Sequence, residues 1–188
     1  MATKPMRILS ADDVLRIPVP DHLSGYELVD GELVAVMPVG NDHGRIVVEL
    51  VSRLHNFVKE RGVPGRVYAE AGFVLGLRRD PERVRGPDVS FVTAETLARI
   101  DVRPNAFLRV APDLAIEVES NERPRIQQRV HDYMEAGTRL LWVIQSASRS
   151  AIVYRADGSA QLLRESDELD GEDVLPGLRI ALPDLLES

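Results

Sequence analysis

Hydrophobic and polar positions alternate in several short stretches of this chain, and the alternation predicts β-strands. Residues 26–38 contain two such runs, which are joined at Asp30 and Gly31. An Asp-Gly pair between two alternating runs is a strong signal for a β-hairpin. The same arrangement recurs over residues 151–163, around a second Asp-Gly pair. The sequence therefore predicts β-hairpins in its N-terminal and C-terminal parts.

Two longer segments have helical spacing instead. Apolar residues fall on one helical stripe from about residue 41 to residue 61, and Gly62 and Pro64 follow as stop signals. A second helix is expected from about residue 124 to residue 136, where Gly137 would end it. These two segments are the main helices that the pattern predicts.

The remaining apolar segments have the pattern of strands. Residues 66–77 alternate, residues 87–92 form a short strand, and residues 139–145 are continuously apolar, as expected of a buried central strand. Residues 78–86 are rich in arginine and are expected to form a loop. The tail, residues 173–186, is expected to contain one strand and a short terminal turn.

The stretch PDLAIEVES, residues 112–120, alternates most regularly. Because successive strand side chains point to opposite faces, Asp113, Glu117 and Glu119 share one side. Leu114 and its apolar successors occupy the other side. The row of acids is either a solvated face or part of a site that requires negative charge, and Asp113 is expected to be solvated.

These elements predict an α/β (α+β) fold, in which a mixed, curved β-sheet is flanked by two main helices and carries N-terminal and C-terminal β-hairpins. A chain of 188 residues fits one domain, with residues 1–24 as an N-terminal extension and a core over about residues 25–187. No segment resembles a signal peptide or a membrane span, so we expect a cytoplasmic protein that does not contact membranes.

The amino-acid composition excludes several kinds of chemistry. The chain has no cysteine, which excludes disulfides, thiol catalysis and cysteine-based zinc sites. Its net charge of −7 argues against a general binder of polyanions. Among 23 basic residues only Lys4 and Lys59 are lysine, so a mechanism that requires a lysine must draw on one of these two.

Three acids lie within predicted strands, where partial burial is expected: Glu70, Asp88 and Glu117. If the strands are neighbours, the carboxylates converge, and two of them about 4 Å apart repel by roughly 4 kcal/mol. A cation would offset this repulsion, and oxygen ligands alone favour Mg²⁺ or Mn²⁺. Solvated acids remain the plainer interpretation. Glycoside hydrolysis by paired carboxylates is weaker, because only 5% of the residues are aromatic.

Several motifs, taken in their order, resemble the Uma2 family of the PD-(D/E)XK nuclease superfamily. They are YELVDGELV, GPDVSFV, APDLAIEV, YMEAGTRLLWVI, IVYRADG and VLPGLRIALPDLL, and together they extend over nearly the whole chain. The resemblance implies a restriction-endonuclease-like core and an Mg²⁺- or Mn²⁺-dependent endonuclease that hydrolyses DNA. It implies that Asp88, Glu117 and Glu70 are metal ligands. By analogy with nucleases that cut both strands, it also suggests a homodimer or higher homo-oligomer.

The chain departs from the superfamily signature at one position. Glu119 stands where the signature has lysine, and the resemblance implies that the following helix supplies the positive charge instead, four residues before Tyr133. That position is Arg129, which can stabilise phosphoryl charge but stays protonated and cannot act as a general base. Arg129 is therefore a candidate catalytic residue together with Asp88, Glu117 and Glu70. The alternative is a catalytically degenerate member that binds nucleic acid or protein.

Arginines close to these acids are candidates for contacts with DNA phosphates. Four lie just before Asp88 and two at the start of the second helix: Arg78, Arg79, Arg83, Arg85, Arg123 and Arg125. The alternative is a solvated loop, because Asp80 and Glu82 halve the charge of the first group.

Overall fold

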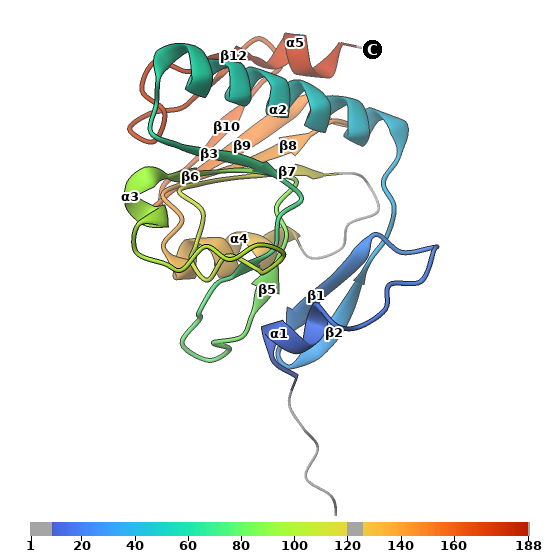
Figure 1. The fold of residues 1–188 in the computed structure, drawn as a ribbon. Helices are drawn as coiled ribbons and strands as arrows, with labels where there is room; N and C mark the ends of the chain where they lie inside the picture. Colours follow the sequence, from blue (N-terminus) through green and yellow to red (C-terminus); the bar gives the residue numbers. More distant parts are fainter. Residues whose placement is uncertain (1–8, 120–125, 188) are drawn as a thin grey trace, which may run out of the picture.

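A six-stranded β-sheet forms the centre of the molecule in the computed structural model, which describes residues 9–119 and 126–187 (Figure 1). Its strand order is β10-β9-β8-β7-β6-β3. Strands β7 and β8 run parallel, and every other neighbouring pair in this sheet is antiparallel. The strands are β3 (Gly65–Ala69), β6 (Val89–Thr93), β7 (Leu114–Glu119), β8 (Leu140–Gln145), β9 (Ser150–Arg155) and β10 (Ala160–Leu163).

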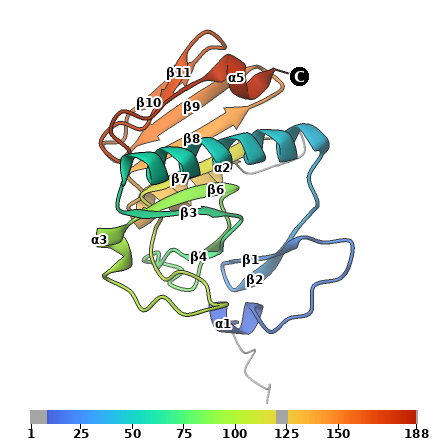
Figure 2. The same cartoon turned by 45° about the horizontal axis from the view of Figure 1, so that its top comes forward.

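The two predicted main helices cover opposite faces of this sheet (Figure 1), and α2 (Asn41–Arg61) lies across the strands in the turned view of Figure 2. Helix α2 lies on one face, and α4 (Ile126–Ala136) lies on the other. The side chains of β7 divide accordingly. Leu114, Ile116 and Val118 are buried in the core on the α2 side, whereas Ala115 is buried in the core on the α4 side. By the same alternation Glu117 points toward the layer of α4.

Glycine ends both helices, as the sequence predicts. Gly62 adopts the left-handed conformation at φ 62° and donates its backbone N–H to the carbonyls at the end of α2. Gly137 follows α4 at φ 94°. Glycine populates this region without the steric penalty of a side chain. At its other end, α2 begins after Gly40, which offers no side-chain cap.

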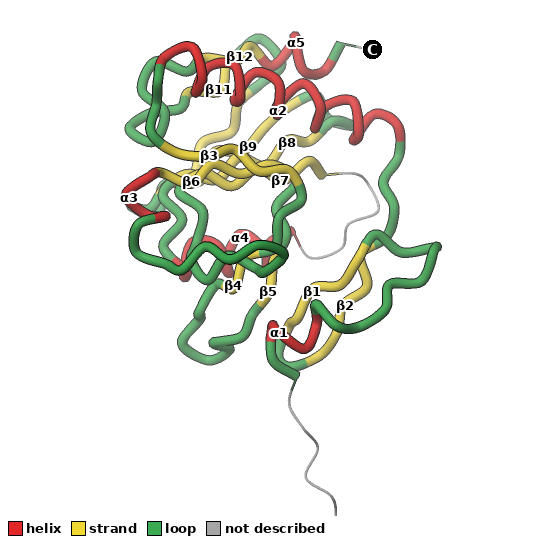
Figure 3. Tube along the Cα trace, viewed as in Figure 1, coloured by secondary structure: helices red, strands yellow, loops and turns green. Residues whose placement is uncertain are grey.

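The predicted N-terminal hairpin belongs to a second, four-stranded sheet beside the central one (Figure 3). Its strand order is β2-β1-β5-β4. The strands are β1 (Gly25–Val29), β2 (Glu32–Val36), β4 (Phe73–Val74) and β5 (Val84–Arg85). A short helix, α1 (Ala11–Val14), packs on this sheet, and Leu28 is at the centre of the small core between them. The hairpin is thus attached to the body of the protein through β5.

Several predicted elements differ in detail. The run expected over residues 66–77 is divided at Glu70, whose φ of 51° ends β3. The arginine-rich segment expected to be a loop contributes β5. At the C-terminus, β12 (Arg179–Ala181) has an additional partner in β11 (Glu168–Asp170), and α5 (Leu182–Leu186) follows it. A further short helix, α3 (Ala94–Leu97), follows β6 directly.

The expectation that Asp113 is solvated is wrong. Its carboxylate is buried and accepts the backbone N–H of Thr93 at 2.8 Å and the hydroxyl of Thr96 at 3.2 Å. Asp113 therefore binds Thr93, the N-cap residue of α3, and connects this helix to the start of β7. None of the described helices is long and apolar enough to cross a membrane.

Candidate active site

Strand pairing brings three acids to the same level of the central sheet. Val89 of β6 faces Ile116 of β7, so one further step in this antiparallel register places Asp88 opposite Glu117. On its other side, β6 pairs with β3, and the backbone N–H of Glu70 donates to the carbonyl oxygen of Asp88 at 3.1 Å. The three acids named from the sequence thus lie on β7 and at the adjoining ends of β3 and β6.

The three acids differ in burial. Asp88 is 4% exposed and Glu117 is 1% exposed, whereas Glu70 is on the surface. One carboxylate oxygen of Asp88 accepts the backbone N–H of Val118 at 2.6 Å. The other lies 3.2 Å from Nε2 of His43, in the first turn of α2, at a distance typical of an ion pair but without hydrogen-bond geometry. Asp88 is therefore held in place by its neighbouring strand.

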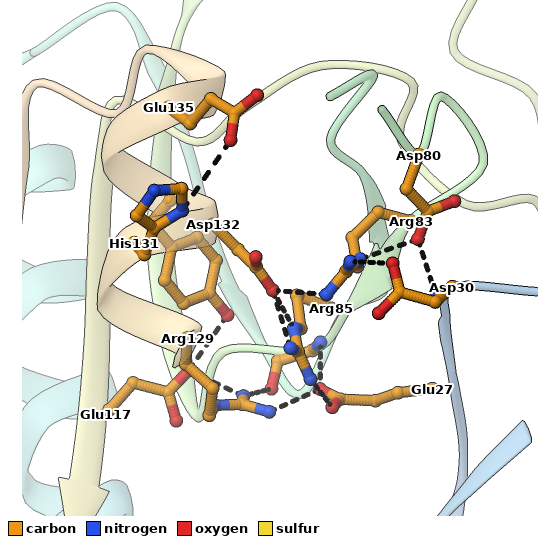
Figure 4. Close-up of polar contacts among 12 residues, drawn as sticks. Glu27, Asp30, Asp80, Arg83, Arg85, Glu117, Arg129, His131, Asp132 and Glu135 are labelled. Carbon is orange, nitrogen blue, oxygen red and sulfur yellow. Dashed lines mark hydrogen bonds and ion pairs between the residues drawn. The ribbon is translucent and has the colours of Figure 1, made fainter. Parts of the chain in front are cut away.

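Glu117 contacts two side chains of α4 (Figure 4). Its Oε1 accepts Nη2 of Arg129 at 2.6 Å and the hydroxyl of Tyr133 at 2.8 Å. Burial and the negative charge of Glu117 raise the pKa of Tyr133 well above its ordinary value. The phenol therefore stays protonated and remains a hydrogen-bond donor to Glu117 across the range in which proteins function.

Arg129 connects three parts of the chain. Besides Glu117, its guanidinium donates to Oε1 of Glu27 at 2.5 Å and to the carbonyl of Gly86 at 2.8 Å. Burial alone would lower the pKa of Arg129, but the negative charges of Glu117 and Glu27 and the hydrogen bond to Glu117 outweigh this effect and raise it well above its ordinary value. Arg129 is therefore a permanent cation beside Glu117.

Glu27 is a residue of this site that the sequence did not identify. It is buried in β1 and also accepts Nη1 of Arg85 at 2.8 Å and the backbone N–H of Gly86 at 3.0 Å. Burial raises the pKa of Glu27, but Arg129 and Arg85 together lower it below its ordinary value. The available signal was an acid whose neighbour on the same face of the predicted strand, Val29, is apolar.

Arg83 and Arg85 are buried in a network of ion pairs. Arg83 donates to Asp80 at 2.7 Å, to Asp30 at 2.8 Å and to Asp132 of α4 at 3.0 Å. Arg85 donates to the same oxygen of Asp132 at 2.5 and 2.7 Å. As Figure 4 shows, the network joins the N-terminal hairpin, β5 and α4. Both arginines are thus engaged by carboxylates of their own chain.

The other four arginines proposed for DNA contacts are placed differently. Arg78 and Arg79 are exposed at the surface, in the loop before β5. Arg123 and Arg125 lie outside the described residues. Of the candidates that the structure describes, only the exposed pair is available to a phosphate without breaking a buried ion pair.

A cavity of about 1060 Å³ lies between the acids and the N-terminal hairpin. Asp88, Glu70 and Arg129 line it on one side, and Met37 and Val39 line it on the side of the hairpin. Glu117 is joined to the cavity through Arg129. Charged groups and apolar side chains therefore border the same space.

The donor set fits Mg²⁺ better than an ion that needs a cage of protein ligands. Among the described residues there is no group of three or more carboxylate or imidazole ligands that could hold a metal. Mg²⁺ is usually held by one or two carboxylates and completes its shell with water and substrate oxygens. Asp88 and Glu117, facing each other on paired strands, are the pair that fits this requirement.

Comparisons with known proteins identify a similar fold and a matching family. The crystal structure of a putative nuclease belonging to DUF820 from Anabaena variabilis ATCC 29413 superimposes with a TM-score of 0.76 and 22% sequence identity, covering 95% of this chain and 97% of that one. The comparison with curated proteins finds no match. The model of the Uma2 family, described as a putative restriction endonuclease, matches residues 11–183. The chain therefore belongs to the Uma2 family, and its fold is that of restriction endonuclease-like proteins.

Proposed function

We propose that the protein is an Mg²⁺-dependent endonuclease that hydrolyses phosphodiester bonds in DNA. The observation that carries the proposal is the pairing of Asp88 with Glu117 on adjacent strands, beside a cavity that a substrate can enter. Two buried like charges on neighbouring strands require a positive partner. Arg129 supplies one positive charge to Glu117, and the ion would supply the next.

Asp88 and Glu117 would hold the metal, with Glu70 at the edge of the same site. A bound Mg²⁺ ion would supply Lewis-acid stabilisation of the charge that develops on the phosphoryl oxygens. Arg129 adds a fixed positive charge, and since its pKa is raised it takes no part in proton transfer. Tyr133 orients the carboxylate of Glu117, and Glu27 orients the guanidinium of Arg129.

Asp88→Asn tests the proposal. The amide oxygen of asparagine can still accept the N–H of Val118, so the strands should remain paired. We expect the variant to lose Mg²⁺ binding, measured by calorimetry, and cleavage of DNA, while its melting temperature changes little. Asp101→Asn is the matched control, because Asp101 has a side chain that is 83% exposed and does not line the cavity. An unaltered Mg²⁺ titration in Asp88→Asn would contradict the proposal.

A second candidate function is a nuclease-fold protein without catalytic activity that binds nucleic acid or protein. It is favoured by Arg129, whose guanidinium is already engaged by Glu27, Gly86 and Glu117. It is also favoured by Glu119, which stands in the lysine position of the signature and accepts the side-chain amide of Gln145 at 2.9 Å. Arg129→Lys separates the two functions. Cleavage that appears only in this variant indicates degeneracy, and cleavage by the unmodified chain excludes it.

A further inference from the structure

We infer that the substrate of this site is a single strand of DNA and not a duplex, an inference that rests on the proposed function. The first reason is the depth of the acids. Asp88 and Glu117 are almost completely buried, and only Asp88 borders the cavity directly. A scissile phosphate must therefore enter the cavity and approach Asp88 beneath the N-terminal hairpin.

The hairpin that forms the opposite side of the cavity is fixed in place. Glu27 of β1 is held by Arg85 and Arg129, and Asp30 at the turn is held by Arg83. The backbone N–H of Asp30 also donates to Asp80 at 2.7 Å. Opening the hairpin as a lid would expose several buried charges and break their ion pairs, which is strongly unfavourable. The width of the cavity is thus set by the folded chain.

The cavity is too small for a double helix. Its volume of about 1060 Å³ equals that of a cube with sides of about 10 Å. One helical turn of B-DNA extends over about 34 Å, several times the width of this cavity. The volume is close to the upper end of the roughly 300–1,000 Å³ that small-ligand pockets occupy. It therefore has room for a short segment of one strand.

The apolar side chains at the cavity match unpaired bases. Leu15, Val19, Met37 and Val39 are exposed to solvent, although each is large and apolar, and all four line this cavity. In a duplex the faces of the bases are covered by stacking, whereas in a single strand they are open to apolar contacts. The aromatic side chain of Phe107 lines the cavity as well and adds a surface of the same kind.

The charged side chains that line the cavity also argue against binding of a duplex. Among the described residues, four acids and two arginines line the cavity: Glu27, Asp42, Glu70, Asp88, Arg85 and Arg129. Duplex binding depends largely on neutralising many phosphates with basic side chains. The described lining has an excess of acids, in a chain of net charge −7, and so supplies little of that neutralisation. Contacts to unpaired bases and to one phosphate suit this composition better.

A comparison of matched oligonucleotides tests the inference. One labelled strand is offered alone and annealed to its complement, and the unmodified protein is assayed for cleavage in Mg²⁺ and for binding in Ca²⁺ by fluorescence anisotropy. We expect the single strand to be bound at least about tenfold more tightly than the duplex and to be cut at least about tenfold faster. Equal or tighter binding of the duplex would overturn the inference, even if cleavage occurs.

A pair of variants tests the apolar contacts. Met37→Glu places a charge on the cavity, and Leu162→Glu places one on β10, away from it; the two residues are 59% and 62% exposed. We expect Met37→Glu to weaken single-strand binding about tenfold and Leu162→Glu to leave it unchanged. Equal effects in both variants would overturn the proposed contact with bases.

The outcomes separate this inference from the proposed function. Cleavage of both substrates at the same rate supports the endonuclease and overturns the single-strand preference. Strong, selective binding of the single strand without cleavage overturns the endonuclease and supports the preference. Absence of both binding and cleavage overturns both. A single-strand substrate also needs only one site, so the homodimer expected by analogy with duplex cleavage is not required.

Discussion

Arg129 and Glu117 meet at 2.6 Å, although one lies on α4 and the other on a strand of the central sheet. The pair places a permanent positive charge against a buried acid that the proposed metal site requires. The same guanidinium also contacts Glu27, which comes from the N-terminal hairpin. One side chain thus joins the hairpin to the acids, and its replacement should affect both stability and function.

Replacing Arg129 by methionine should destabilise the protein by about 3–5 kcal/mol, because Glu27 and Glu117 would remain buried without their shared cation. Urea unfolding followed by circular dichroism measures this loss. Arg78→Met is the control, because Arg78 is exposed and its replacement should alter stability by less than about 0.5 kcal/mol. Similar midpoints for the two variants would show that Arg129 is not a structural ion-pair partner.

Glu27→Gln should be destabilising in a way that depends on pH. Because Arg129 and Arg85 lower the pKa of Glu27 below its ordinary value of 4.5, its carboxylate stabilises the folded state fully above pH 4.5. This contribution is lost as the pH falls through the lowered pKa. The unfolding free energies of Glu27→Gln and the unmodified chain should therefore differ by about 3 kcal/mol at neutral pH and converge in acid. A difference that stays constant down to low pH would contradict this assignment.

Tyr133→Phe removes one hydrogen bond to Glu117 and little else, since the ring remains in the core on the α4 side. The expected cost is about 0.5–1.5 kcal/mol, the usual contribution of a buried hydrogen bond. Because the raised pKa of Tyr133 keeps the phenol neutral, the variant should not alter the pH dependence of cleavage. A changed pH profile would instead assign Tyr133 a role in proton transfer.

Asp132→Asn should loosen the N-terminal hairpin. A single oxygen of Asp132 accepts donors from both Arg83 and Arg85, so the loss of its charge weakens two of the ion pairs that connect β5 to α4. We expect faster hydrogen exchange in β1 and little change in β8, which lies in the central sheet. The variant should also discriminate less between single-stranded and duplex DNA, measured by the anisotropy assay, because its cavity can open more easily.

Local patterns carried enough information to predict the sheet and its two helices, and they singled out Asp88 and Glu117 as acids that converge if their strands are neighbours. Alternation in residues 112–120 determines which side chains face each helix, and that division is confirmed. The burial of Asp113 was not predicted, because its partners lie at the start of α3, about twenty positions earlier in the chain. An acid at the start of a strand is expected to be solvated, and only the folded structure shows which distant groups donate hydrogen bonds to it.

Contacts between distant segments were the part that sequence patterns could not supply. Glu27 and Arg129 are separated by 102 positions, and no periodicity relates them. The burial of Arg83 and Arg85 depends in the same way on Asp132, which lies 49 and 47 positions later. Charged residues in a row usually indicate a solvated loop, and only their three-dimensional partners show otherwise.

The separation of Glu27 from Arg129 also affects how the protein is made. The hairpin leaves the ribosome early, but its buried carboxylate has no guanidinium from α4 until 102 further residues have been added. At typical rates of synthesis this interval lasts roughly 5–20 s. During that time the nascent chain carries an incomplete site, so the acids, the cation and the cavity cannot come together before α4 has been synthesised.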